Sequence, residues 1–248
     1  MISERALRTE LSAAARSLHA RGFCANHEGN VTARLGGGRF LATPGAVSKR
    51  LSEPDALVVL DDRGAVLGRG RSFSEAGLHL AVYRARPDAG AVVHAHPPFS
   101  TAFACAGRAL DRPILAEAVV SLGAEIPLVP FAPPGEPAVA ALAPFLGRFD
   151  AVLLGQHGVL SWGDDLEQAL LRLEHVEHVA RIAHLAEPLG GARPLPAEAL
   201  PALLAARQKA FPRLAQAPAT TPRATVIPNA SPDLARIIAE ELASALKT

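Results

Sequence analysis

The chain has 248 residues, and its 25 Lys and Arg against 24 Asp and Glu leave a formal net charge of +1. This length, with 49% hydrophobic residues, can bury a full core and suits one large domain or one domain with an appendage. The neutral balance gives no electrostatic basis for a nucleic-acid or anionic-membrane partner, and no apolar run is long enough for a transmembrane helix. The charged N-terminal segment lacks a signal-peptide pattern, and Cys24 and Cys105 form neither a CxxC motif nor a disulfide framework. We therefore expect a cytoplasmic protein.

Periodicity and turn residues predict alternating strands and helices over the first 190 residues. In chain order we expect a helix at 3–21, a glycine-turn hairpin at 31–35 and 39–42, strands at 57–60 and 65–67, a helix at 74–86, a strand at 91–96, a helix at 100–106, a strand near 126–131, a helix at 137–146, a strand at 151–154 and a long helix at 165–187. This order favours an α/β sandwich around a mixed sheet.

The composition changes after Pro188, because nine of the 21 prolines lie in residues 188–248. We therefore divide the chain into a main domain over 1–190 and a proline-rich C-terminal extension over 191–248, with helices at 197–210 and 233–246. The second helix has a strong start, with Ser231 as N-cap and Pro232 at the first helical position.

Three histidines form the strongest candidate site. His94 and His96 are two residues apart in the predicted strand at 91–96, so both side chains point to the same face. His157 follows the buried strand at 151–154, beside Gly158, where the chain must turn. Three neutral imidazoles around an open position suit a catalytic divalent ion, whereas an HxH pair alone is more often a pair of structural histidines.

Glu75 begins the predicted helix at 74–86, where a carboxylate stabilises the positive end of the helix dipole. That structural role is one interpretation of the residue. The other is an acid/base group beside the metal ion, which partial burial and a nearby cation would tune.

Several short motifs accompany the histidines and Glu75 in chain order: Gly29-Asn30-Val31-Thr32, Thr43-Pro44-Gly45, Ser74-Glu75, Arg84-Ala85-Arg86-Pro87-Asp88, His94-Ala95-His96-Pro97-Pro98, Val129-Pro130-Phe131, Ala151-Val152-Leu153-Leu154 and His157-Gly158-Val159. Taken in this order, they resemble the class II aldolase/adducin family, and in layout its L-fuculose-phosphate and L-ribulose-phosphate types. The resemblance covers about residues 5–190 and none of the last 55 or so.

The resemblance implies that residues 1–190 are a catalytic domain with a three-layer αβα sandwich around a central mixed or antiparallel sheet. It also implies a homotetramer with active sites between subunits. His94, His96 and His157 match the family's ligands of Zn²⁺, or of another divalent ion such as Mn²⁺ or Co²⁺, and Glu75 matches its acid/base. Such an ion acts as a Lewis acid that stabilises the enediolate left when a C–C bond beside a carbonyl breaks.

The rival aldolase chemistry is a Schiff base, which requires a buried lysine. Only three of the 25 basic residues are lysines. Lys49 falls beside Arg50 in what we expect to be a polar turn, while Lys209 and Lys247 fall in the extension. The scarcity of lysine therefore disfavours this route.

The chain departs from the family pattern at the segments that hold a substrate phosphate in sugar-phosphate members. The loop at 26–30 contains Glu28, whose carboxylate would repel a phosphate dianion. The turn at Thr43-Pro44-Gly45 is one residue short, and Phe73 replaces one member of a serine pair. The remaining candidates for substrate binding are Asn30, Thr43, Gly45, Ser74 and His27.

The tyrosine that donates a proton in fuculose-type aldolases has no counterpart here. The single tyrosine, Tyr83, falls inside the 74–86 helix, where we expect a core residue. Glu117 is the only acid in segment 112–118, and it is a second acid/base candidate, with a structural carboxylate as the alternative. We interpret His175, His178 and His184 as surface or interface residues.

Together these features predict a metal-dependent lyase of aldolase type in carbohydrate metabolism, acting on a small hydroxylated, sugar-like substrate. The alternative on the same metal centre is decarboxylation of a hydroxy acid, keto acid or dihydroxyaromatic acid, which the weakened phosphate loop and the missing tyrosine favour. A non-catalytic, adducin-like interaction module is a third interpretation. The three histidines and Glu75 argue against it, because a module without chemistry needs no open metal site.

Overall fold

The computed structural model describes residues 3–212. The helix predicted at 233–246 lies outside the described residues. Within residues 3–212, no helix is both long and apolar enough to cross a membrane. Cys24 and Cys105 are both free thiols.

A seven-stranded sheet forms the centre of the described part of the chain, with the spatial order β3-β2-β1-β4-β7-β6-β5. Neighbouring strands are antiparallel except β5 and β6, which are parallel. The strands are β1 (Asn30–Gly36), β2 (Arg39–Ala42), β3 (Val58–Leu60), β4 (Ala91–Ala95), β5 (Leu128–Val129), β6 (Ala151–Leu154) and β7 (Gly158–Gly163).

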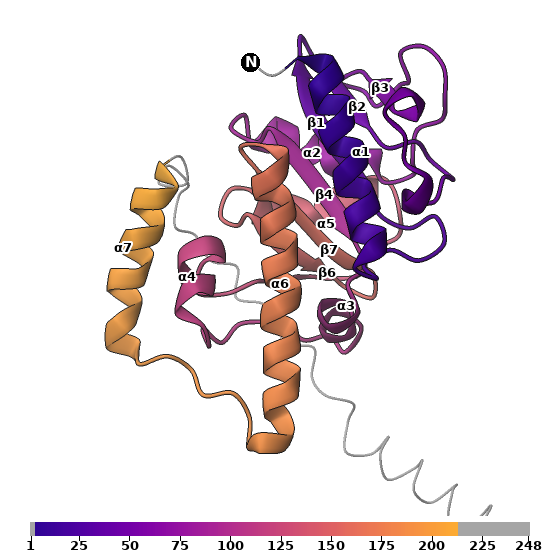
Figure 1. Cartoon of the computed structure of the whole chain (residues 1–248). Helices are drawn as coiled ribbons and strands as arrows, with labels where there is room; N and C mark the ends of the chain where they lie inside the picture. Colours follow the sequence, from indigo (N-terminus) through magenta and orange to yellow (C-terminus); the bar gives the residue numbers. More distant parts are fainter. Residues whose placement is uncertain (1–2, 213–248) are drawn as a thin grey trace, which may run out of the picture.

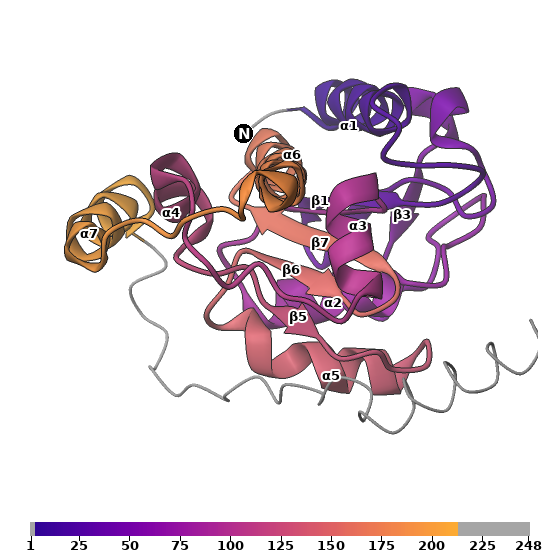
Figure 2. The same cartoon turned by 90° about the horizontal axis from the view of Figure 1, so that it is seen from below.

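Helices cover both faces of this sheet, which confirms the three-layer αβα prediction. Figures 1 and 2 show α1 and α6 on one face, with α3 on the same side, and α2 and α5 on the other. The helices are α1 (Glu4–Ala20), α2 (Ala76–Ala85), α3 (Pro98–Cys105), α4 (Ala116–Leu122), α5 (Glu136–Leu146), α6 (Leu166–Ala186) and α7 (Leu200–Ala210).

Strand β4 is buried on both faces, and its period of two directs alternate residues into two separate cores. Ala91, Val93 and Ala95 pack in the core under α1 and α6. Val92 packs in the core under α2 and α5. His94 has the same parity as Val92, so it faces the α2 side of the sheet. The fold therefore directs the histidines toward the beginning of α2.

One strand and one helix of the structure were not predicted from the sequence. Residues 158–163 form strand β7, which pairs with both β4 and β6. They directly follow a tight turn in which Gln156 has a φ of +55°. Because this turn is so short, the sequence pattern did not separate a second strand from the turn. Residues 116–122 form α4, between the helix predicted at 100–106 and the strand predicted near 126–131, where the sequence pattern predicts no regular element.

Two predicted strands are shorter than expected. The strand predicted at 126–131 is reduced to β5 and an isolated bridge between Leu110 and Ile126. The strand predicted at 65–67 is a single bridge between Leu60 and Val66. Both segments lie at the edges of the sheet, where a strand has only one neighbour to extend its pairing.

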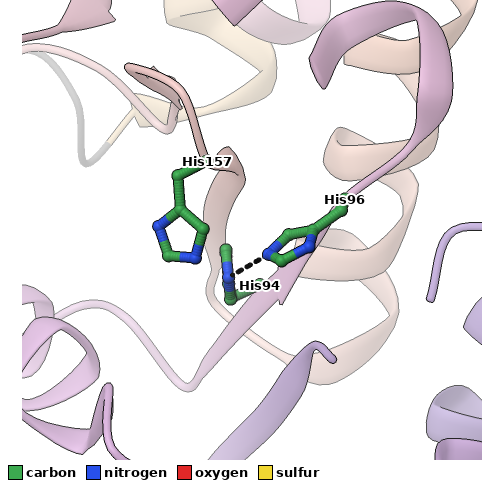
Figure 3. A group of neighbouring side chains, drawn as sticks. All are labelled: His94, His96 and His157. Atoms are coloured by element: carbon green, nitrogen blue, oxygen red, sulfur yellow. Dashed lines mark hydrogen bonds between the residues drawn. The ribbon is translucent and has the colours of Figure 1, made fainter. Parts of the chain in front are cut away.

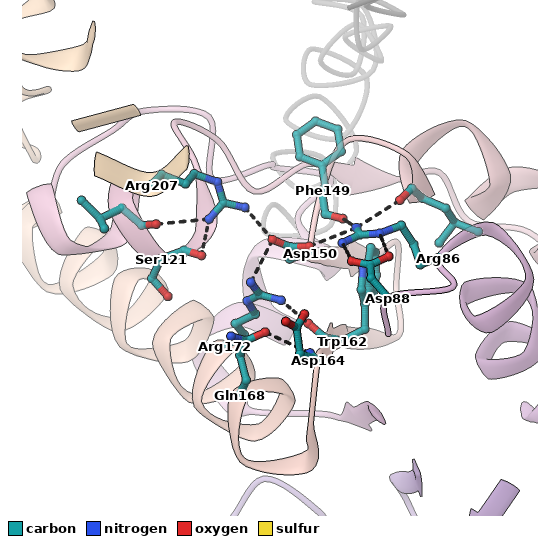
Figure 4. Close-up of polar contacts among 12 residues, drawn as sticks. Arg86, Asp88, Ser121, Phe149, Asp150, Trp162, Asp164, Gln168, Arg172 and Arg207 are labelled. Carbon is teal, nitrogen blue, oxygen red and sulfur yellow. Dashed lines mark hydrogen bonds and ion pairs between the residues drawn. The ribbon is translucent and has the colours of Figure 1, made fainter. Parts of the chain in front are cut away.

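The first helix of the C-terminal extension is present as α7 and contacts α4 (Figure 1). Arg207 of α7 reaches the fully buried carboxylate of Asp150, with Nη2 2.6 Å from Oδ2, and donates from Nη1 to the carbonyl oxygens of Val120 and Ser121. Arg86 and Arg172 contact the same carboxylate at 3.0 and 3.1 Å (Figure 4). This part of the extension is therefore anchored to the main domain, while the division at residue 190 stays a prediction.

Candidate metal centre

The three histidines come from neighbouring strand ends. His94 lies in β4 opposite Asn30 of β1 and Leu160 of β7, and His96 directly follows β4. His157 lies in the turn between β6 and β7. Because β4 and β7 are paired neighbours, the turn returns His157 to the end of β4. Figure 3 shows the three imidazoles converging there.

Their donor atoms have spacings that suit a tetrahedral ion. One ligand atom from each of His94, His96 and His157 lies within 4.8 Å of the others, and the Nε2 atoms of His94 and His96 are 3.1 Å apart. A tetrahedral ion with metal–nitrogen distances of about 2.0–2.1 Å requires donor atoms about 3.3 Å apart. The cluster therefore fits a divalent cation, and it is the only such group among residues 3–212.

The backbone sets the tautomer of His94. Its Nδ1 lies 2.8 Å from the carbonyl oxygen of Val159, which can only accept a hydrogen bond. Nδ1 therefore carries the proton, and the lone pair of Nε2 points to the centre of the triad. Hydrogen bonds of this kind orient metal-binding histidines and increase their basicity.

Two glycines allow the backbone to approach this closely. A Cβ atom on Gly158 would lie 2.5 Å from both the Ala95 carbonyl oxygen and His96 Cδ2. Gly29 has a φ of +72°, and a Cβ there would lie 2.4 Å from the sulfur of Cys24. The glycines next to His157 and Asn30 are thus part of the construction of the site.

Glu75 lies inside the cluster, at the N-terminus of α2. Its Oε1 is 2.7 Å from His157 Nε2 and 3.5 Å from His94 Nε2, and its Oε2 accepts a hydrogen bond from Asn30 Nδ2 at 2.7 Å. Burial alone would raise the pKa of Glu75, but the adjacent imidazoles of His94 and His157 outweigh burial and lower it. Glu75 is therefore ionised, and a cation at the triad would act in the same direction.

Burial and the Glu75 carboxylate have opposite effects on the pKa values of the histidines. Burial alone would lower the pKa of His94, but the Glu75 carboxylate raises it. His96 has a pKa lowered to about 4 by burial and by the neighbouring His94 and His157. A neutral imidazole is the form that binds metal, so His96 is available as a ligand at neutral pH.

The residues predicted to bind substrate fall into two groups. Asn30 is buried beside Glu75, and its Oδ1 has no hydrogen-bond partner within residues 3–212, while Ser74 and His27 are exposed. Thr43 is buried and its hydroxyl accepts a hydrogen bond from the Val31 amide, and the Gly45 amide donates to Arg71 O. Asn30 and Ser74 thus flank the metal centre with free polar groups, whereas the polar groups of Thr43 and Gly45 are used by the fold.

Glu117 and Tyr83 lie away from the triad's donor atoms. Glu117 is exposed in the first turn of α4, and α4 and α3 lie on opposite sides of α6 (Figures 1 and 2). Its charge acts on His175 of α6. Tyr83 is buried, with its hydroxyl 2.9 Å from Thr32 Oγ1, which confirms a core position, and burial raises its pKa.

The predicted environment of Lys49 was wrong. Lys49 is 3% exposed, and its Nζ donates to the carbonyl oxygens of Val47 and His27 at 2.9 and 3.3 Å. Burial lowers its pKa, against the opposing influence of Cys24 and Glu75. The Val47 carbonyl belongs to the same loop as Lys49, but the His27 carbonyl comes from a loop 22 residues earlier, so local periodicity could not predict that Lys49 is buried. The one available signal was a lysine retained in a chain that otherwise uses arginine almost throughout.

Comparison with known proteins agrees with this geometry. A family model described as "Class II Aldolase and Adducin N-terminal domain" matches residues 9–184. A 3-oxo-tetronate 4-phosphate decarboxylase of Escherichia coli is 34% identical over 185 residues, covering 72% of this chain and 86% of the relative. A 5-methylthioribulose-1-phosphate/5-deoxyribulose-1-phosphate aldolase of Rhodospirillum rubrum is 35% identical over 189 residues, covering 74% and 84%.

A solved L-fuculose 1-phosphate aldolase superposes with a TM-score of 0.74 at 25% identity, covering 80% of this chain and 94% of that structure. The comparison by sequence and the comparison by fold therefore identify the same kind of relative. The chain belongs to the class II aldolase and adducin family.

Proposed function

We propose that this protein is a divalent-metal-dependent carbon–carbon lyase of aldolase type, acting on a small, hydroxylated, sugar-like substrate. The observation that carries the proposal is the position of the Glu75 carboxylate, in contact with His94 and His157 and anchored by Asn30. A carboxylate held inside a cluster of metal-binding histidines combines a Lewis-acid site with a proton-transfer group. Zn²⁺, Mn²⁺ and Co²⁺ are the candidate ions.

When bound at the histidines, the ion would supply a positive charge that stabilises the negative charge developing on the substrate's oxygen atoms as the C–C bond breaks. The protein's own residues divide the remaining work. His94, His96 and His157 would hold the ion, and Glu75 Oε1 lies beside them, 2.7 Å from His157 Nε2 and 3.5 Å from His94 Nε2. From this position Oε1 can accept a proton from a substrate bound at the histidines, or return one to it.

Asn30 sets which oxygen of Glu75 is free to act. Its Nδ2 donates to Oε2, so Oε1 is the atom that exchanges a proton with the substrate. The side-chain oxygen Oδ1 of Asn30 is buried and has no partner among the described residues, so we propose that it accepts a hydrogen bond from a substrate hydroxyl. Ser74 and His27 are proposed as further contacts at the exposed side, and Thr43 and Gly45 as residues that shape the adjoining loop.

Decarboxylation of a hydroxy acid, keto acid or dihydroxyaromatic acid is the second candidate function. Breaking a C–C bond to carbon dioxide leaves the same charge to stabilise, and it needs no tyrosine to take the proton of the hydroxyl that becomes an aldehyde. The position of Glu28 favours this candidate. Its carboxylate lies 3.3 Å from His96, on the loop where sugar-phosphate members hold the phosphate. Relatives named for each of the two activities match the chain about equally well.

We further propose a cytoplasmic homotetramer with active sites between subunits, which assigns a role to Glu117. Within one chain, Glu117 is exposed on α4, and α4 lies on the opposite side of α6 from α3 (Figure 1). It can act as the second acid/base only if it enters the site of a neighbouring copy. A non-catalytic, adducin-like role is disfavoured by the intact triad.

A substrate panel tests the proposal. The purified protein, loaded with Zn²⁺, Mn²⁺ or Co²⁺, is assayed against sugar phosphates, unphosphorylated aldols and hydroxy acids, with both aldehyde and carbon dioxide release followed. Metal-dependent aldehyde release supports the lyase, and metal-dependent carbon dioxide release selects the second candidate. Absence of a divalent ion in protein purified without chelators, together with no turnover after reloading, would contradict both.

A further inference from the structure

Glu28 occupies a defined place beside the metal centre. Its Oε2 lies 3.3 Å from His96 Nδ1 and accepts a hydrogen bond from the Ala25 amide at 3.2 Å. The Glu28 amide in turn donates to the Ala25 carbonyl oxygen at 3.0 Å. These reciprocal bonds close a tight turn that aims the carboxylate at the histidine.

The same loop contacts His96 through its backbone. The His96 amide donates to the Phe23 carbonyl oxygen at 2.9 Å, while its Nε2 faces His94 Nε2 at 3.1 Å. A carboxylate beside Nδ1 favours the tautomer with the proton on Nδ1. That tautomer leaves the lone pair of Nε2 directed toward His94 and the centre of the triad.

Lys49 fixes the loop that carries Glu28. Its buried ammonium donates to His27 O, one residue before Glu28, and to Val47 O in its own loop. Gly29, one residue after Glu28, approaches the carbonyl oxygen of His94 so closely that a Cβ there would lie 3.0 Å from it. The Glu28 carboxylate is 41% exposed, but the backbone on both sides of it is held.

We propose that Glu28 is a positioning residue of the metal centre: it holds the His96 ring in the metal-binding tautomer and increases its strength as a ligand. His94 and His96 then have different supporting partners, because His94 donates to a backbone carbonyl whereas Nδ1 of His96 lies 3.3 Å from a carboxylate oxygen. The inference rests on the proposed metal-dependent function. It assigns to Glu28 a supporting role instead of one in contact with substrate.

Metal affinity tests the proposal without any substrate. The apparent Zn²⁺ dissociation constant is measured by competition with a chromophoric chelator for the wild type, Glu28→Ala, Glu28→Gln and the control Glu10→Ala. Loss of a partner of this kind weakens metal binding by about 10–100-fold, which we expect for Glu28→Ala. Glu28→Gln keeps an acceptor oxygen but loses the charge, so its affinity should fall between the two. Glu10 is exposed on α1, and its replacement should change nothing.

A second readout reports the ligand geometry. The visible absorption spectrum of the Co²⁺-loaded protein should shift in Glu28→Ala and remain at the wild-type position in Glu10→Ala. If Glu28→Ala does not fold by circular dichroism, Glu28→Gln alone decides. Dissociation constants within twofold of wild type and an unchanged Co²⁺ spectrum would overturn the role of Glu28. A wild-type protein that binds no divalent ion would instead contradict the proposed function.

Discussion

Replacing Arg207 with methionine tests how the C-terminal extension is attached to the main domain. The guanidinium of Arg207 donates to the carbonyl oxygens of Val120 and Ser121 and pairs with Asp150 at 2.6 Å. Asp150 is fully buried, and the side chain of Arg207 is 11% exposed. Methionine retains the apolar length of the side chain, so the substitution removes mainly these polar contacts.

The expected decrease in the free energy of unfolding depends on the arginines that still contact Asp150. Removing one partner of an isolated buried ion pair costs about 3–5 kcal/mol. Here Arg86 and Arg172 still contact the carboxylate, so we expect the lower free-energy cost of about 2–3 kcal/mol for hydrogen bonds to a charged group. For a chain of this size, that corresponds to a decrease in Tm of about 4–12 °C.

Urea denaturation and thermal melting measure this loss, with Lys209→Met as the matched control. Lys209 lies in the same last turn of α7 but is exposed, so its replacement should leave stability within about 0.5 kcal/mol of wild type. Hydrogen exchange should also show faster opening of α7 and α4 in Arg207→Met. A variant as stable as Lys209→Met, with unchanged exchange in α7, would refute the attachment through Asp150.

Three further predictions concern the site and its surroundings. His79 is fully buried, and burial lowers its pKa to about 3 from an ordinary 6.5, with His94 and Glu75 as its charged neighbours. The unfolded chain therefore binds a proton that the folded chain excludes, so His79 favours folding above pH 6.5 and this contribution falls by about 2 kcal/mol on acidification to pH 5. His79→Gln should reduce the loss of stability between pH 7.5 and 5 in urea titrations, and an identical loss in both proteins would exclude His79 as its source. Chelation of the metal ion by EDTA should abolish turnover. Borohydride added with substrate should not inactivate the enzyme, because Lys49 donates to two carbonyl oxygens and is not required as a nucleophile. Covalent trapping of substrate on Lys49, found by peptide mapping, would reverse this conclusion. Gly158→Ala should displace His96 and weaken Zn²⁺ binding about tenfold or more, whereas Gly147→Ala, where a Cβ meets no atom within 4 Å, should bind Zn²⁺ normally; equal affinities would show that the close approach at Gly158 is dispensable.

The sequence was most informative where function depends on local periodicity. The spacing of two between His94 and His96 placed both side chains on one face of β4, and parity with Val92 puts that face toward α2 and Glu75. The interpretation of Tyr83 as a core residue followed from its place inside the helix predicted at 74–86, and the structure agrees. These inferences needed no knowledge of contacts between distant segments.

Features that depend on distant loops were not predictable in this way. Lys49 becomes buried because the loops at residues 27 and 47 both supply carbonyl oxygens to it. Glu28 reaches His96 because the loop that carries it hydrogen-bonds to the end of β4. The six residues of strand β7 carry only a weak strand pattern, and the strand forms because it pairs with both β4 and β6. In each case tertiary contacts override a weak local signal.

The most direct test of the central claim separates metal binding from turnover at Glu75. Metal content by plasma emission spectrometry and the turnover of a substrate identified in the panel are measured for the wild type, His94→Ala and Glu75→Gln. The account predicts that His94→Ala loses both metal and turnover, and that Glu75→Gln retains metal while its turnover falls by at least about 10²-fold. Wild-type turnover in a metal-loaded Glu75→Gln protein would contradict the account.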